Sequence, residues 1–493
     1  MKRIYVCLRI GVASLFFVLL ASCTCKPDNV EKKDIMPPIY PDYVGVTIPV
    51  GIAPLNFNVI GNVDVVYITV KGSMEGELIA VGSYADFDID EWHKLLSANK
   101  GGQLEITVFA KYDGKWIEYK TFPIYVSNYP LEAWGLTYRR VAPGYEVYSK
   151  MGIYQRCLGS FEETPIIENT VAPGSCVNCH TPNKTDPQRF TFHVRGEHGS
   201  TLVQIDGRRE WIKSFNDSIH GSMVYPYWHP SGNYCAYSTN QTYQSYHAVK
   251  GERIEVFDQS SDVFVYEPST HQLLLDTLLM TPDHFETYPV FSPDGTALYF
   301  CSAVTEPIPS RYKYIRYDLC KIDFDPNKGE FGERVDTLFS ASSRGMSATH
   351  PRISYDGRWL MFTMADYGCF PIWHKEADNW ILDLTTGIAH PLETANSEDT
   401  DSWHNWSIDS HWFVFTSRRG DGLYTHLYLA CVDEDGNASK PFLLPQENPY
   451  EYYDALLDSY NTPDFTSRKV EFDMRQACRE IMSDKRIPTK VKQ

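Results

Sequence analysis

The chain has 493 residues, which is long enough for two or three domains with sizeable cores. Hydrophobic residues make up 43% and charged residues 22%, a balance that excludes widespread disorder, and the 14% share of aromatic residues favours strands. The formal net charge of -18 at pH 7 excludes a nucleic-acid-binding surface or attraction to anionic lipids. We therefore expect a folded, strand-rich protein with no nucleic-acid partner.

The N-terminus has the pattern of an export signal. Lys2 and Arg3 precede an apolar run that is too short to remain as a membrane-spanning helix, so residues 1–22 are predicted to be cleaved. Leu20-Ala-Ser-Cys23 resembles the bacterial lipobox, which implies that Cys23 is lipidated and anchors the chain to a membrane. A plain secretory signal is the alternative. We expect a lipoprotein of the bacterial cell envelope, at the outer membrane, with residues 23–36 as a solvated tether.

The spacing of most of the twelve cysteines does not indicate a disulfide framework. Outside the signal, the lipobox and one close pair, they occur singly, and several lie inside apolar strand patterns such as Tyr234-Cys-Ala-Tyr237. Small buried thiols are the expected role. One or two disulfides remain an alternative, because the export signal predicts an oxidising compartment.

Residues 37–129 alternate short apolar strands with Pro, Gly and Asn. Val65-Val-Tyr-Ile-Thr-Val70 and Leu104-Glu-Ile-Thr-Val-Phe-Ala110 are two such strands, and Lys111-Tyr-Asp-Gly-Lys115 is a hairpin turn. Six or seven strands in this length predict a β-sandwich of the immunoglobulin-like type. No catalytic pattern occurs there, so spacing or contact with an envelope partner is the expected role.

A repeat dominates the rest of the chain. The four copies are Tyr225-Pro-Tyr-Trp-His-Pro-Ser-Gly232, Tyr288-Pro-Val-Phe-Ser-Pro-Asp-Gly295, His350-Pro-Arg-Ile-Ser-Tyr-Asp-Gly357 and the looser Trp403-His-Asn-Trp-Ser-Ile-Asp-Ser410. The Asp-Gly ending closes a tight turn, and an alternating strand follows each copy. Four strands per unit in several consecutive units predict a β-propeller.

The turn sequence Phe291-Ser-Pro-Asp-Gly295 resembles that of TolB-type, WD-repeat-like propellers. The resemblance covers about residues 140–465 and implies a propeller over residues 130–465, with six blades expected and seven as the alternative. Residues 466–493 are predicted to be a helical tail that caps it. TolB-like domains serve as docking platforms, peptidase gates or supports for catalytic residues. No Gly-x-Ser-x-Gly motif occurs, which excludes the peptidase function.

The stretch Cys176-Val-Asn-Cys-His180 carries the chemistry that is most specific in this sequence. Cys-x-x-Cys-His is the attachment pattern of c-type haem, in which two thiols bind the porphyrin vinyl groups and the histidine is an axial iron ligand. We expect one covalent haem c, on an insertion at about residues 171–200. The alternatives are a zinc site completed by His193 and His198, a disulfide between Cys176 and Cys179, and chance.

Four residues are candidates for the sixth iron ligand, and each is also explained by ordinary packing. They are His193, His198, His220 and Met223. Arg195 is a candidate partner for a haem propionate through a charge-assisted pair, although a surface ion pair would explain it equally.

A second candidate site comes from the repeat itself. Its first two positions begin a strand near one mouth of the channel, so Tyr225, Tyr288, His350 and His404 are expected to converge there. Some metal-dependent lyases that resemble TolB-type propellers place histidines in this region, which makes a metal a second hypothesis. Packing between blades is the simpler interpretation.

The leading functional hypothesis is an extracytoplasmic, membrane-anchored mono-haem cytochrome on a propeller scaffold, acting in electron transfer or small-molecule redox chemistry with a redox or envelope protein partner. Propeller subunits with c-type haem, such as hydrazine synthase α-subunits, show a similar pairing of motifs, and this likeness implies no substrate. The alternatives are a non-catalytic binding or scaffold lipoprotein and a metal-dependent lyase that uses channel histidines. Whether the chain is an enzyme stays open at this point.

Overall fold

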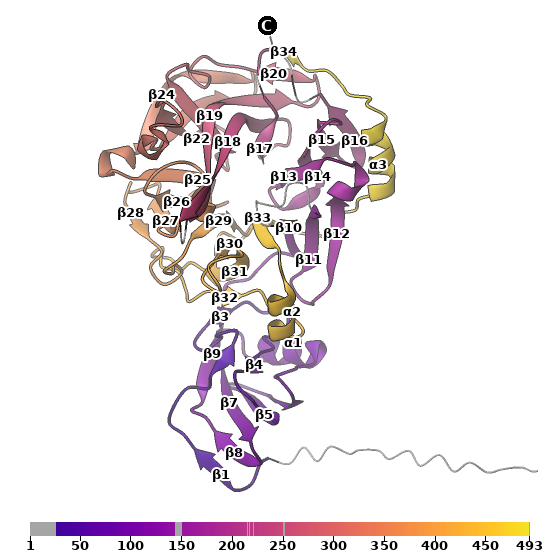
Figure 1. The fold of residues 1–493 in the computed structure, drawn as a ribbon, viewed down its shortest axis with the longest axis vertical. Coiled ribbons are helices and arrows are strands. Elements are labelled where there is room, and N and C mark those ends of the chain that lie inside the picture. The colour runs from indigo at the N-terminus through magenta and orange to yellow at the C-terminus, as the bar shows by residue number, and fades with distance from the viewer. Residues whose placement is uncertain are drawn as a thin grey trace, which may run out of the picture.

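The computed structural model describes residues 26–142, 150–213, 215, 217–219, 221–249 and 252–492. These residues form a small N-terminal β-domain and a large ring of sheets (Figure 1), so the chain is all-β, as predicted. No helix among them is long and apolar enough to cross a membrane. The export signal and Cys23 lie outside the described residues.

The N-terminal domain is built on a seven-stranded sheet and a separate strand pair. The sheet consists of β1 (Val30–Lys32), β3 (Thr47–Ile48), β5 (Val65–Gly72), β6 (Glu77–Gly82), β7 (Gln103–Tyr112), β8 (Lys115–Glu118) and β9 (Phe122–Val126), and the pair is β2 (Ile39–Tyr40) with β4 (Asn58–Val59). In β5 every second side chain, Val66, Ile68 and Val70, is fully buried. The domain begins before the expected residue 37, because β1 pairs in parallel with β8.

The N-terminal domain also contains a helix that the strand patterns did not predict, α1 (Ile89–Ala98). Asp88 caps its first turn by accepting a backbone hydrogen bond at 3.0 Å, which satisfies an N–H that the helix itself cannot. Trp92, Leu95 and Leu96 are buried at helical spacing and pack into the core of the domain.

Six antiparallel sheets of four strands surround a central axis and form the blades of a propeller (Figure 1). From the inner to the outer strand, blade 1 consists of β33 (Ser459–Thr466), β10 (Gly135–Val141), β11 (Met151–Cys157) and β12 (Glu163–Glu168). Blade 2 consists of β13 (Cys176–Asn183), β14 (Asp186–Arg195), β15 (Ser200–Ile205) and β16 (Arg208–Ile212). Blade 3 consists of β17 (Val224–Trp228), β18 (Cys235–Val249), β19 (Glu252–Glu267) and β20 (Gln272–Leu274). Blade 4 consists of β21 (His284–Phe291), β22 (Ala297–Val304), β23 (Asp318–Asp325) and β24 (Glu330–Phe339). Blade 5 consists of β25 (Ser347–Ile353), β26 (Trp359–Ala365), β27 (Asp378–Asp383) and β28 (Ala389–Pro391). Blade 6 consists of β29 (Asp401–Trp406), β30 (Trp412–Ser417), β31 (His426–Cys431) and β32 (Phe442–Leu443).

The ring is closed by a strand from the C-terminal part of the chain. The inner strands β13, β17, β21, β25, β29 and β33 contact one another in turn, and β33 also contacts β13. Strand β33 follows the short helix α2 (Pro449–Ala455) and pairs antiparallel with β10, so blade 1 joins the two ends of the propeller segment. Six blades, the expected number, are present.

The expected haem-binding insertion at residues 171–200 is wrong as a description of the fold. A short 3-10 turn, Asn169–Val171, leads into β13 and β14, and these two strands are the inner half of blade 2. The Cys-x-x-Cys-His motif led to the expectation of an insertion, but β13 pairs in register with β14 on both sides of a bulge. The cysteine motif is therefore part of a regular blade.

The C-terminal tail runs around the outside of blades 2 and 3. Helix α3 (Met474–Met482) forms only part of the predicted helical tail and buries Ala477 and Ile481 against blade 2, whereas Met482 is 45% exposed. The last strand, β34 (Lys490–Val491), pairs in parallel with β20. The tail thus covers the side of the propeller, not a mouth of its channel.

The turns that define the repeat share one hydrogen-bonded geometry. The Ser292 hydroxyl donates to Asp294 Oδ1 at 2.5 Å, and Gly295 has the left-handed φ of 76° that such a turn requires. In the fourth copy Ser410 takes the place of the glycine and still adopts a φ of 65°, while Ser407 donates to Asp409 at 2.7 Å. The departure from glycine therefore leaves the turn intact.

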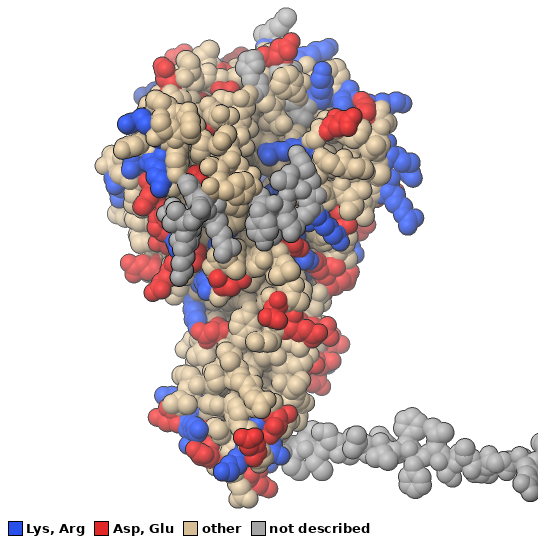
Figure 2. All heavy atoms as spheres, in the orientation of Figure 1, with Lys and Arg blue, Asp and Glu red and all other residues tan. Residues whose placement is uncertain are grey.

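The N-terminal domain docks on blade 6 through buried contacts. The Tyr43 hydroxyl donates to the Leu443 carbonyl at 3.2 Å, and the rings of Tyr129 and His411 stack at 3.9 Å. One hydrophobic core continues across the junction. Basic and acidic side chains are interspersed on the face of the molecule seen in Figure 2, so this face presents no continuous basic surface.

Candidate functional site

Every inner strand carries a bulge at the same level of the channel. Two residues of the inner strand oppose one residue of its neighbour, and the first of the two has a left-handed φ. These residues are Cys179 (52°), Tyr225 (49°), Tyr288 (53°), His350 (54°), Trp403 (49°) and Thr462 (46°). Because an L-residue adopts this conformation at a cost, its recurrence in all six blades marks a constraint of the fold.

Four of these residues pack their rings against one another. The ring centroids are 4.5 Å apart for Tyr225 and Tyr288, 4.1 Å for Tyr288 and His350, and 4.0 Å for His350 and Trp403. Tyr225 and Trp403 complete the group at 6.3 Å. The structure thus brings together three of the four expected channel residues, in an aromatic group that fills this level of the channel.

His404, the fourth expected channel residue, does not join this group. Its Nδ1 lies 3.0 Å from Asn379 Oδ1 of blade 5, and the ring is buried between blades 5 and 6. Trp403 takes the channel position, because it is the residue with the left-handed φ. The alignment of Trp403 with Tyr225 in the repeat contained this signal, and the choice of the histidine one position later was wrong.

The cysteine motif uses the same bulge. Cys179 is the left-handed residue of β13 and His180 follows it, so the second half of the motif coincides with Tyr225 and Pro226 of the next blade. Cys176, Cys179 and His180 are 8%, 9% and 3% exposed. Both thiols are free, so the structure contains no disulfide between them.

The imidazole of His180 has the protonation state of a metal ligand. Burial lowers its pKa to about 3, with the Thr137 backbone acting in the opposite direction and Arg139 adding to the decrease. Neither ring nitrogen makes a hydrogen bond of good geometry to a described residue. A buried, neutral imidazole next to two free thiols fits the donor set of covalently attached haem in chemical kind.

Two arginines place positive charge near the thiols of the motif. Burial raises the pKa of Cys179, whereas the positive charges of Arg195 and Arg139 act to lower it. Arg139 Nη2 is 3.3 Å from Cys176 Sγ and 3.4 Å from Met151 Sδ. Arg139, on β10 of blade 1, had no signal in the sequence, because its position depends on how blades 1 and 2 pack.

The candidate sixth ligands are distributed over different environments. His193 is buried in β14 opposite Asn178, its Nδ1 is 3.0 Å from Thr201 Oγ1, and burial lowers its pKa to about 3. The Nδ1 of His198 lies 2.8 Å from Oδ1 of Asp484 in the tail. Met223 is buried in the apolar core between blades 2 and 3, and His220 lies outside the described residues.

Of these candidates, His193 has the environment that suits a ligand best. Its Nε2 has no hydrogen-bond partner among the described residues, and it is on the strand next to the cysteine motif. The contact with Asp484 explains the position of His198, and packing in the apolar core explains that of Met223.

A long hairpin extends from blade 3 over one mouth of the channel. Strand β18 pairs with β17 only as far as Ser238, whereas β18 and β19 continue to pair with each other beyond it, and we call residues 239–249 and 252–262 the arm (Figure 1). Glu255 of the arm accepts a hydrogen bond from Tyr367 at 2.8 Å, and its other oxygen is 3.4 Å from His374 Nε2. These contacts hold the arm against the loop between β26 and β27.

The His374 imidazole is held between two carboxylates. Nδ1 is 3.2 Å from Glu376 Oε1, on the side opposite to Glu255. Burial acts to lower the pKa of His374, but the close contacts with the Glu255 and Glu376 carboxylates outweigh it and raise the pKa to about 9. The arm is therefore fastened by a charged histidine at neutral pH.

Asp258 of the arm is a buried carboxyl group at this mouth. One of its oxygens accepts hydrogen bonds from Asn240 at 2.8 Å, Cys369 at 3.2 Å and Tyr317 at 3.3 Å, and the other has no partner among the described residues. Burial raises its pKa to about 7, although these three donors lower it. The sequence did not single out this group.

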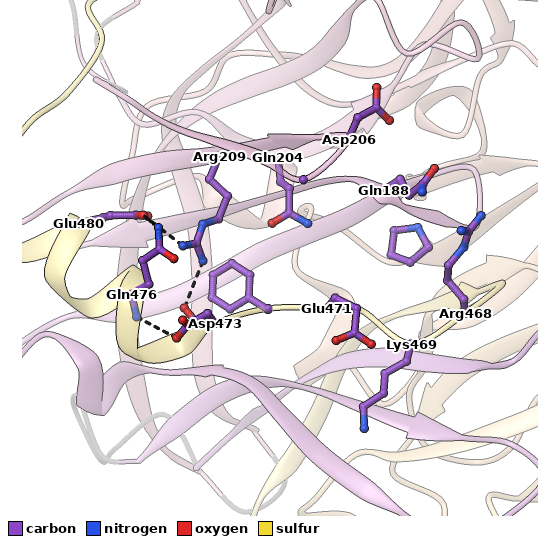
Figure 3. Close-up of a pocket in the computed structure, with 13 residues that line it drawn as sticks. Gln188, Gln204, Asp206, Arg209, Arg468, Lys469, Glu471, Asp473, Gln476 and Glu480 are labelled. Atoms are coloured by element: carbon purple, nitrogen blue, oxygen red, sulfur yellow. Dashed lines mark hydrogen bonds and ion pairs between the residues drawn. The ribbon is translucent and has the colours of Figure 1, made fainter.

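A groove of about 810 Å³ lies elsewhere, between the outer strands of blade 2 and the segment that leads into α3 (Figure 3). Arg209 crosses it, with Nη2 3.1 Å from Glu480 Oε1 and Nη1 3.1 Å from the Asp473 carbonyl, and lies over the Phe472 ring. Arg209 and Glu480 pair within the groove, whereas Arg468 and Lys469 pair with Asp186 and Glu162 outside its lining. It fastens the tail to blade 2.

The zinc and lyase hypotheses find little support in the described part of the chain. No group of three or more His, Cys, Asp or Glu side chains within it could hold a metal ion. His193 contacts Thr201 whereas His198 contacts Asp484. His350 packs against Tyr288 in the channel, whereas His404 contacts Asn379 of blade 5.

No protein-family model and no curated protein sequence matches the chain. Solved structures with a similar fold include TolB from Acinetobacter baumannii, with 13% identity over 77% of this chain and 86% of that chain and a TM-score of 0.43. An oligogalacturonate lyase from Vibrio parahaemolyticus shares 10% identity over 78% of this chain and 94% of that chain, with a TM-score of 0.32. A puromycin-hydrolysing peptidase of Mycobacterium tuberculosis shares 11% over 70% and 50%, with a TM-score of 0.35.

Proposed function

We propose that this chain is an exported propeller cytochrome with one covalently bound haem c, serving electron transfer or small-molecule redox chemistry. Cys176 and Cys179 would hold the porphyrin and His180 would be an axial ligand. The observation that carries the proposal is the His180 imidazole, which is buried, neutral and without a good hydrogen bond among the described residues. Such a group is costly to bury unless something binds it.

When bound, an iron porphyrin would supply one-electron chemistry, and this chain's own residues would tune it. The blades on both sides of β13 keep water from His180 and so hold its nitrogens in the neutral form that can ligate a metal. His193 is the described residue best suited as a second ligand. Arg139 and Arg195 add positive charge beside the thiols, and this charge would favour the reduced form of a bound iron, because that form carries one positive charge fewer.

The cellular setting belongs to the same proposal. Lipidation at Cys23 after removal of residues 1–22 would anchor the protein in the cell envelope, at the outer membrane, where a redox or envelope protein could reach the propeller. The short apolar run and the lipobox pattern support this placement. Covalent haem attachment outside the cytoplasm agrees with it.

A binding or scaffold propeller without haem is the second candidate function. It is favoured by the position of Cys179, which is that of Tyr225, Tyr288, His350, Trp403 and Thr462 in the other blades. A side chain at this level packs in the channel whatever its chemistry. In that case the thiols would be structural.

Substitution of the cysteines separates the two functions. Full-length protein is produced with a haem-attachment system, denatured, separated by gel electrophoresis and stained for haem. The proposal expects a haem-positive band that disappears in Cys176→Ala/Cys179→Ala and persists in the control Cys301→Ala, a fully buried thiol of blade 4. A colourless wild-type band with folded protein would support the scaffold function instead.

A further inference from the structure

Two guanidinium groups without carboxylate partners lie beside the cysteine motif. Neither Arg139 nor Arg195 forms an ion pair with a described residue. The neighbouring Arg140, in contrast, pairs with Glu163 at 2.6 Å and with Asp458 at 3.0 Å. In a chain with 63 acidic and 45 basic residues, two arginines that have no counter-ion among the described residues need an explanation.

The fold directs both groups to one place. Arg195 is paired in register with Cys176, and paired residues of an antiparallel ladder project from the same face of the sheet. Arg139 reaches Cys176 from blade 1, with 3.3 Å between Nη2 and Sγ. Both positive charges act on the thiol of Cys179 as well. Arg139 therefore contacts the Cys176 side chain from blade 1, and Arg195 lies opposite Cys176 on the neighbouring strand of blade 2.

The contacts of Arg139 leave its charge poorly satisfied. Its Nη2 donates to two sulfur atoms, which are weak acceptors, and its Nε is buried with no partner among the described residues. A partly buried charge without a counter-ion is costly, so an anion at this position would stabilise the folded protein. Guanidinium groups bind carboxylates in a bidentate manner, which makes the carboxylate the matching ligand.

We propose that Arg139 and Arg195 form an anion site for carboxylate groups, beside Cys176. The carboxylates could come from two sources, the propionates of a bound porphyrin or a free small dicarboxylate. The first source rests on the proposed function, whereas the second is independent of it. This site extends the sequence-based role of Arg195 by a second arginine from another blade.

The first part of the test uses the colourless full-length chain, produced without a haem-attachment system, and succinate as the probe in titration calorimetry. Arg139→Gln and Arg195→Gln are each expected to weaken succinate binding about 10- to 100-fold. Arg208→Gln is the matched control, because Arg208 is on the outer strand of the same blade, 72% exposed and paired with Glu210. Arg139→Lys and Arg195→Lys keep the charge and should retain part of the affinity. Thermal melts verify that each variant folds.

The second part repeats the titration with haem-loaded protein. Succinate binding that is lost on loading, together with a changed haem midpoint potential in Arg195→Gln, identifies the propionates as the ligand. Binding that persists identifies a free carboxylate. The anion site is overturned if succinate binds wild type and the Gln variants alike in the colourless form and the variants leave the haem spectrum and potential unchanged. If no haem attaches, the proposed function fails, and the colourless titration still decides the anion site.

Discussion

Cys179 and Tyr288 occupy equivalent positions in blades 2 and 4, with φ angles of 52° and 53° at the first residue of the bulge in each inner strand. The second cysteine of the haem-type motif therefore lies at a bulge that the inner strands of all six blades share. The last two residues of the motif take the conformation that Tyr288 and Pro289 take elsewhere. Any function of the motif has to be compatible with this strand geometry.

Substitutions at Cys179 test the left-handed backbone. In colourless protein, Cys179→Gly should unfold at a denaturant concentration close to wild type, whereas Cys179→Val should lose about 1–2 kcal/mol more, because a β-branched residue resists a positive φ. The matched pair is Cys301→Gly and Cys301→Val in the regular strand β22, where valine should be the better replacement. The same order at both positions would contradict the bulge.

Truncation tests the closure of the ring. A chain that ends before Ser459 lacks β33, the inner strand of blade 1, and should lose cooperative thermal unfolding. A chain that ends at Asp484 lacks only residues 485–493, which include β34, and should melt within a few degrees of the full chain. Circular dichroism melts measure both. Cooperative unfolding of the shorter chain would show that closure by β33 is dispensable.

The buried His374 predicts a loss of stability at alkaline pH. Its pKa is raised from 6.5 to about 9, so its contribution is complete below about pH 6.5 and disappears as the pH rises through 9. The stability difference between wild type and His374→Gln should shrink by about 3 kcal/mol between pH 6 and pH 10. Chemical denaturation of both proteins at several pH values measures it, and a constant difference would contradict the pairing with Glu255 and Glu376.

The buried carboxyl group of Asp258 predicts that the stability of the fold decreases between pH 4 and pH 7. Its pKa is raised to about 7, so the folded state keeps a proton that the unfolded chain releases near pH 4, and stability falls as the pH rises from 4 to 7. Asp258→Asn removes this proton linkage. The variant should gain about 3–4 kcal/mol relative to wild type between pH 4 and pH 8. An unchanged difference over this range would mean that the carboxylate is ionised in the fold.

The sequence predicts those features that local patterns determine. The propeller follows from four turns that share one backbone hydrogen bond, and even Ser410 keeps the left-handed turn without glycine. Strand alternation likewise predicts the N-terminal domain, whose β5 buries every second side chain. Helix α1 was missed because its three buried residues lie in a short segment between strands.

Features that depend on packing between blades could not be predicted in this way. The Cys-x-x-Cys-His motif led to the expectation of an insertion, yet the bulge places Cys179 on the inner strand of blade 2. Arg139 meets Cys176 only because β10 of blade 1 packs beside β13. Asp258 becomes buried because the arm folds over the channel mouth, a contact between segments more than 100 residues apart.

The most direct test of the central claim is the intact mass of the purified mature protein, produced with a haem-attachment system, together with its visible spectrum. The account predicts about 0.6 kDa above the mass of the processed, acylated chain and a Soret band that sharpens on reduction. Both should disappear in Cys176→Ala/Cys179→Ala. A wild-type mass equal to that of the acylated polypeptide, with no Soret absorption, would contradict it.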